Sequence, residues 1–165
     1  MSRRNPRKGF VLIVTTVVLV VLLALAGLGS DIGRMYVIKS ELQAFTDAAA
    51  LTAALQMDGT AAGLGRARDA AAKLATGPNA MKWDLGTKTV TDITATFAGG
   101  DLAPDPKTWQ KEPRDAGSSR YVRVAAIAPA PLIFLRAFQV VQSDFSTVAA
   151  SSVACKAGGP ARLLP

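Results

Sequence analysis

An uncharged apolar run near the N-terminus is the strongest pattern in the chain. Phe10 to Gly29 holds twenty residues without a charge, and its only hydroxyl side chains are Thr15 and Thr16. As an α-helix this run would be roughly 30 Å long, which is the thickness of the hydrocarbon core of a bilayer. Threonine hydroxyls can bond to carbonyls of their own helix, so both are tolerated in lipid. The run therefore predicts a transmembrane helix over residues 10–29.

The helical pattern continues beyond the apolar run. Apolar residues recur at spacings of 3, 4, 3 and 4, which is the period of one helix face. They are Met35, Ile38, Leu42, Phe45 and Ala49. Because residues 31–57 contain no proline, the span and this stripe are predicted to form one long helix. Two interpretations of the stripe stay open: it packs on the protein's own domain, or it packs against other copies or partner pilins.

In the rest of the chain, a second helical pattern is followed by patterns typical of β-strands. Thr60 can begin a second helix, and the sequence at residues 76–78 ends it. Alternating patterns predict strands over residues 87–97, 120–128 and 145–154. Pro129 and Pro131 are expected to break the second strand and to begin a short apolar helix over 132–141. The predicted fold class is α+β: a long N-terminal transmembrane/amphipathic helix, a second helix, and a small antiparallel sheet with a short inserted helix.

This pattern divides the chain into five predicted segments. They are a basic cytoplasmic leader (1–9), a transmembrane helix (10–29), an extracytoplasmic helical region (30–78), a small β-rich domain (79–155) and a flexible tail (156–165). The part outside the membrane buries only a modest core, because small domains bury a small fraction of their surface. Support from the membrane or from neighbouring proteins is therefore expected.

The charge distribution changes the meaning of the net charge of +7. Four of the nineteen basic residues lie among the first eight, at Arg3, Arg4, Arg7 and Lys8, and no acid precedes Asp31. A basic segment before a span marks the cytoplasmic side. We therefore expect a cytoplasmic N-terminus, an exported remainder and a lipid bilayer as partner. The charge gives no reason to expect a nucleic-acid surface.

Candidate chemistry is sparse. The chain has no histidine and one cysteine, which excludes a Ser-His-Asp triad, a Cys-His dyad, a histidine-ligated metal and an intramolecular disulfide. The stretch Asp115-Ala-Gly-Ser118-Ser119 is only loosely similar to a serine-containing metal loop, and its middle serine is replaced by glycine. We predict no catalytic, cofactor-binding or metal-binding residues, and therefore no enzyme.

Two processing alternatives compete with a plain anchor. Ala24-Leu25-Ala26 has the small-residue spacing of a signal-peptidase site, so a secreted binding module could be released after cleavage near Ala26. Cleavage between Gly9 and Phe10, after a short basic leader, is the pattern of type IV prepilins. These two residues are the candidate processing site.

Several short motifs occur in a familiar order. They are Lys8-Gly9-Phe10, a Val/Leu span ending Leu25-Ala26-Gly27-Leu28, Asp31-Ile32-Gly33-Arg34-Met35-Tyr36, Glu41-Leu42-Gln43 and Asp47-Ala48-Ala49-Ala50-Leu51. This arrangement resembles the N-terminal region of Flp pilus-assembly TadE/TadG-like proteins. The resemblance implies a non-enzymatic protein of the bacterial inner membrane, with a periplasmic or extracellular C-terminal domain.

The resemblance also implies a role and a class of partner. The expected role is that of a membrane-anchored, pilin-like accessory or minor component of a tight-adherence (Flp/Tad) pilus system. Its expected partners are other pilus or envelope proteins, contacted through the N-terminal helix. Prepilins usually carry glutamate five residues into the mature helix, and counting from Phe10 this position is Val14. A retained anchor is therefore expected rather than a processed filament subunit.

Overall fold

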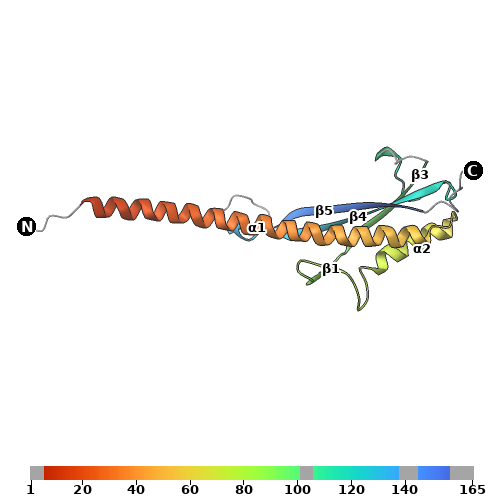
Figure 1. The fold of residues 1–165 in the computed structure, drawn as a ribbon, viewed down its shortest axis with the longest axis horizontal. Helices are drawn as coiled ribbons and strands as arrows, with labels where there is room; N and C mark the ends of the chain where they lie inside the picture. Colours follow the sequence, from red (N-terminus) through yellow and green to blue (C-terminus); the bar gives the residue numbers. More distant parts are fainter. Residues whose placement is uncertain (1–5, 101–105, 138–144, 157–165) are drawn as a thin grey trace, which may run out of the picture. The chain divides into compact units, whose positions relative to one another are not determined.

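One continuous helix dominates the structure, a computed structural model that describes residues 6–100, 106–137 and 145–156. Helix α1 runs from Pro6 to Gln56 without interruption (Figure 1). The Thr15 and Thr16 hydroxyls donate to the carbonyls of Val11 and Leu12, at 2.8 and 2.9 Å. The most apolar stretch of α1 has a mean hydropathy of 3.0, and only 6% of that stretch is buried. The predicted long helix is confirmed, and by length and composition it can cross a bilayer.

The chain forms two compact units. The first comprises residues 1–36 and 130–146, and the second comprises residues 37–129 and 147–165. The first unit contains the apolar part of α1 and the short helix α3 (Phe134–Ala137). The second unit contains the C-terminal part of α1 and most of the β-structure. Each unit is described by itself below.

A three-stranded sheet has the strand order β3-β4-β5. Strand β3 (Asp92–Gly99) pairs antiparallel with β4 (Ser119–Pro131), and β5 (Phe145–Cys155) lies on the other side of β4. The register places Phe97 opposite Val122, and both side chains are fully buried. Alternate residues of β4 face the interior, as a half-buried strand requires. The α+β class and the presence of three strands are confirmed, but the strand predicted over 87–97 begins at Asp92, and residues 88–89 belong to a separate hairpin.

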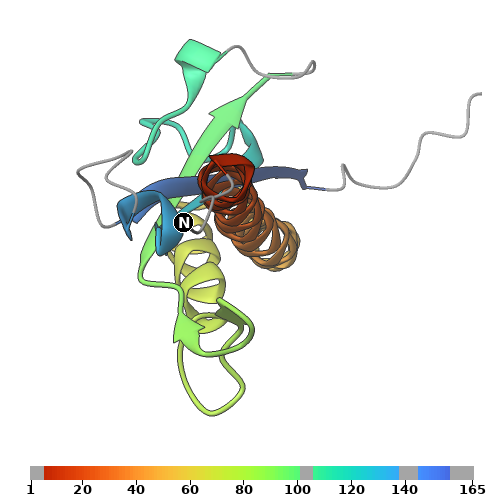
Figure 2. The ribbon, with the colours of Figure 1, turned by 90° about the vertical axis from the view of Figure 1, so that its left-hand side faces the viewer.

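Helices cover the sheet within the second unit. Three large side chains of α1, those of Ile38, Leu42 and Phe45, are almost completely buried and supply much of the core. Helix α2 (Ala61–Lys73) lies beside the C-terminal part of α1 in both views (Figures 1 and 2). It buries Leu64 and Ala67. Small alanines on both helices allow this close packing.

The start of α2 has a well-formed cap. Thr60 is the N-cap residue, and its hydroxyl accepts a hydrogen bond from the Gly63 amide at 3.0 Å. Hydrogen bonds from the Thr60 hydroxyl and amide, followed by one from Arg66, hold the pKa of the exposed Asp58 carboxyl well below its ordinary value. The ionised Asp58 carboxylate therefore stabilises the folded state at pH values above the pKa that this carboxyl has in the unfolded chain. This stabilisation is lost as the pH falls through the lower pKa of the folded state. A side chain at Gly63 would collide with Asp58.

A two-stranded hairpin, which the sequence patterns did not predict, follows α2. Strands β1 (Lys82–Trp83) and β2 (Lys88–Thr89) pair antiparallel. The Trp83 indole N–H donates to the Thr89 carbonyl at 2.9 Å. The Leu85 amide in the turn donates to the Glu41 carboxylate at 3.1 and 3.3 Å, which ties the hairpin to α1. Two-residue strands are too short for a periodic signal.

The prediction that Pro129 breaks the middle strand is wrong. Strand β4 continues to Pro131, with Ala128 buried just before Pro129 and Ala130 buried between the two prolines. The pairing of β4 with β3 ends at Ile127, so neither proline needs to donate a hydrogen bond on that side. The predicted apolar helix is present as α3, but it begins at Phe134 rather than at 132. Residues 138–141 of that prediction, and 157–165 of the predicted tail, lie outside the described residues.

Candidate functional site

The predicted packing stripe of α1 lies largely inside the protein. Ile38, Leu42, Phe45 and Ala49 are buried, and Met35 is half-buried. Polar side chains beside the stripe join α1 to β5. Gln43 Nε2 donates to Ser152 Oγ at 2.9 Å, and Thr46 Oγ1 lies 2.8 Å from the same oxygen. Lys39 also donates to the carbonyl of Ala149. The protein's own domain therefore occupies this face of the helix.

A different face of α1 is uncovered in the second unit. We call it the exposed face of α1, and it consists of Val37, Ser40, Ala44, Leu51 and Leu55. Leu51 is 63% exposed and Leu55 is 83% exposed. These positions recur at helical spacing, and none carries a charge. The sequence patterns did not predict this face, because the stripe on the opposite side of the helix is more apolar.

A buried carboxylate organises the first unit. Asp31 lies two residues after the end of the apolar run at Gly29, and only 2% of it is exposed. Its two carboxylate oxygens accept hydrogen bonds from the amides of Ile133, Phe134 and Leu135, at 3.2, 3.0 and 2.8 Å. These amides begin α3, where backbone N–H groups lack partners within the helix. Asp31 therefore caps a turn that lies about a hundred residues away in the sequence.

A glycine one helical turn before Asp31 makes room for the same segment. A Cβ atom at Gly27 would lie 2.7 Å from Cβ of Phe134 and 2.8 Å from its Cγ. No real Cβ approaches another carbon so closely, so only glycine fits here without movement of Phe134. Gly27 and Asp31 together fix the position of the turn 132–136 on α1. Both residues belong to the motifs that carry the family resemblance, but no sequence pattern predicted this contact.

Both candidate cleavage points lie within α1. Gly9 and Phe10 belong to the helix, and Phe10 is exposed. The bond after Ala26 lies in the same uninterrupted helix, beside the contact between Gly27 and Phe134. Proteolysis at either point requires local unwinding of the helix. Among the described residues, neither point lies next to a cluster of reactive side chains.

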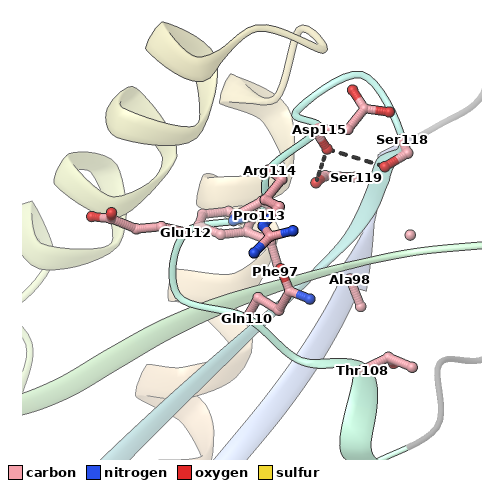
Figure 3. A pocket seen from close by; sticks show the side chains of 11 residues that line it. Phe97, Ala98, Thr108, Gln110, Glu112, Pro113, Arg114, Asp115, Ser118 and Ser119 are labelled. Atoms are coloured by element: carbon pink, nitrogen blue, oxygen red, sulfur yellow. Dashed lines mark hydrogen bonds between the residues drawn. The ribbon is translucent and has the colours of Figure 1, made fainter.

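A polar pocket of about 550 Å³ lies at the end of β3 (Figure 3). Its charged lining comes from Glu112, Arg114 and Asp115 in the segment before β4. The Asp115 carbonyl accepts hydrogen bonds from the hydroxyls of Ser118 and Ser119, at 3.0 and 3.3 Å. The two serines are thus bonded to a backbone carbonyl rather than to a base, and the stretch forms a local turn. Within the described residues no group of three or more Cys, Asp or Glu side chains could hold a metal ion.

The comparisons with known proteins support one family. Residues 9–72 match the model of a family described as "Putative Flp pilus-assembly TadE/G-like". The resemblance predicted from the sequence is therefore confirmed over these residues, which include the apolar run, Asp31 and the whole exposed face of α1. No curated protein and no solved structure matches the chain.

Proposed function

We propose that this chain is a membrane-anchored, pilin-like accessory or minor component of a Flp/Tad pilus-assembly system. The observation that carries the proposal is the family match over residues 9–72, which covers most of the long helix α1 and all but the last residue of α2. One element thus combines an apolar segment with a segment built into a folded unit. This is the arrangement expected of a protein that presents a small domain at a membrane surface, and its role is structural rather than enzymatic.

The membrane anchor is argued from exposure and charge. Apolar side chains along residues 10–29 are largely exposed in the isolated chain. An exposed apolar surface of this size is unfavourable in water. Lipid is the solvent that fits them. The four basic residues before the run support a cytoplasmic N-terminus, with the folded units outside the inner membrane.

The first prediction separates a retained anchor from its two alternatives. We expect the mature protein purified from native membranes to retain residues 1–26, as measured by intact mass spectrometry. The proposal favours retention because Val14 replaces the usual glutamate and because α1 continues through both candidate cut points. Loss of residues 1–26 would instead support a secreted binding module, and loss of residues 1–9 would support prepilin-like processing.

The exposed face of α1 is the surface that we propose for contacts with other pilus components. Small residues at Ser40 and Ala44 permit close approach of a second helix, and Leu51 and Leu55 supply apolar area beyond them. The predicted stripe cannot serve this purpose while it is buried against β5 and the rest of the sheet. The partner class, other Tad/Flp pilus or envelope proteins, is inferred from the family match.

The second prediction tests this surface. In a bacterium that needs this chain for Flp pili, the double variant Leu51→Glu/Leu55→Glu is expected to restore less than about a tenth of the surface pili, because it places two charges in an apolar contact. Pili are counted by electron microscopy after complementation of a deletion strain. Membrane levels of the variant should match those of the wild type, since both side chains are exposed.

The matched control is Ala62→Glu, which adds a charge at an exposed position in the first turn of α2. It should restore pili fully. Normal pilus numbers with the double variant would contradict the proposed docking face, whereas normal pili in the deletion strain itself would contradict the role in pilus assembly.

A further inference from the structure

The turn that Asp31 caps exposes apolar side chains next to the membrane anchor. Ile133 is 55% exposed and Phe134 is 40% exposed, although both are large and apolar. The surrounding sequence is equally apolar: Arg136 is the only charged residue between Arg123 and Asp144. Exposed apolar residues that cluster in one turn mark a surface that contacts something other than water.

The position of this turn along α1 is fixed by two contacts. Phe134 lies against Gly27, and the amides of residues 133–135 bind Asp31. Gly27 is inside the uncharged run, two residues before its end at Gly29, which is about 3 Å along the helix. If residues 10–29 cross the bilayer, Phe134 therefore lies at the depth where hydrocarbon meets the headgroups.

The neighbouring part of α1 presents the same chemistry. Leu25, Leu28 and Ile32 are exposed in the turns that flank Gly27 and Asp31. Tyr36, which is 76% exposed, follows at the distance of the headgroup layer, where tyrosine is enriched. The apolar surface of the turn is thus continuous with the surface that the span offers to lipid. This continuity favours lipid over a protein partner.

We propose that the turn 132–136 inserts into the outer leaflet of the same bilayer as a second, non-spanning membrane contact. Its occupant is lipid at the boundary of headgroups and acyl chains, with Ile133 and Phe134 as the inserted side chains. The turn cannot span the bilayer, because α3 has only four residues. Asp31 makes insertion feasible by satisfying the amides that would otherwise lack partners in lipid. The inference rests on the proposed anchor.

The experiment measures the depth of single sites in the full-length protein. In a Cys155→Ala background, Ile133→Cys is labelled with an environment-sensitive fluorophore, and the protein is reconstituted into phosphatidylethanolamine/phosphatidylglycerol vesicles. Lipids carry a spin-label quencher either near the carbonyl end or near the methyl end of the acyl chain. We expect about a twofold loss of emission with the shallow quencher and a smaller loss with the deep one, as for an interfacial segment.

Two reference sites make the outcomes distinguishable. Val18→Cys, in the middle of the span, should be quenched more strongly by the deep label. Leu55→Cys is 83% exposed near the end of α1 and should be quenched by neither. Quenching at Val18 without quenching at Ile133 overturns the inference and leaves the anchor intact. Absence of quenching at Val18 overturns the anchor and the inference together.

Discussion

Phe45→Ala is expected to lower the free energy of unfolding of the second unit by about 4 kcal/mol, the typical cost of removing a buried aromatic ring. Phe45 is 1% exposed and lies among Ile38, Leu42 and Ala49, so its loss leaves a cavity in the helix–sheet core. Thermal unfolding of the detergent-solubilised full chain, followed by tryptophan emission, should show a midpoint lower by about 15 °C. Trp83 is a suitable reporter because it is buried in the same unit.

The control for Phe45 is Leu51→Ala on the same helix. Leu51 is on the exposed face of α1, so its truncation should change stability by less than about 0.5 kcal/mol. Equal and small effects of both substitutions would mean that the stripe of α1 is not buried against the sheet. In that case the interpretation in which the stripe binds partner pilins would regain support.

Asp31→Ala is expected to release the turn 132–136 from α1 at a cost of about 3 kcal/mol, because three amides lose a charged acceptor. The effect is local, so hydrogen exchange read by mass spectrometry is the appropriate measurement. Amides of residues 133–135 should exchange about a hundredfold faster than in the wild type. Exchange in residues 38–56 of the second unit should be unchanged.

Asp31→Asn provides the matched comparison, because it keeps the shape and one oxygen acceptor but removes the charge. Its exchange rates should lie between those of the wild type and Asp31→Ala. Unchanged exchange at residues 133–135 in the alanine variant would contradict the capping role of Asp31. It would also remove the physical basis for placing this turn at the membrane boundary.

Much of the helical architecture was predictable because its signals are local. The uncharged run and the stripe from Met35 to Ala49 each extend over several helical turns, and α1 contains both of them. The start of α2 was predictable from Thr60, since N-caps have a strong residue preference. The end of β4 was predicted wrongly, because the effect of its prolines depends on where the partner strand ends, which no local pattern reveals.

The contacts that define the candidate surfaces were harder to predict. The cap of Asp31 on residues 133–135 joins segments about a hundred residues apart, so periodicity carries no trace of it. The sequence holds two weak signals: an acid two residues after the end of an uncharged run, and a proline-led turn whose first amides need an acceptor. The exposed face of α1 was missed for a different reason, since small residues such as Ser40 and Ala44 score poorly in a search for apolar stripes.

The most direct test of the account uses the single cysteine. Cys155 lies at the end of β5 and is exposed. A membrane-impermeant maleimide added to intact spheroplasts should label Cys155 in a protein that stays with the membrane during alkaline extraction. A Ser2→Cys/Cys155→Ala variant should be labelled only after the membrane is permeabilised. Labelling of Cys155 that requires permeabilisation, or release of the protein by alkaline extraction, would contradict an anchored protein whose folded units lie outside the inner membrane.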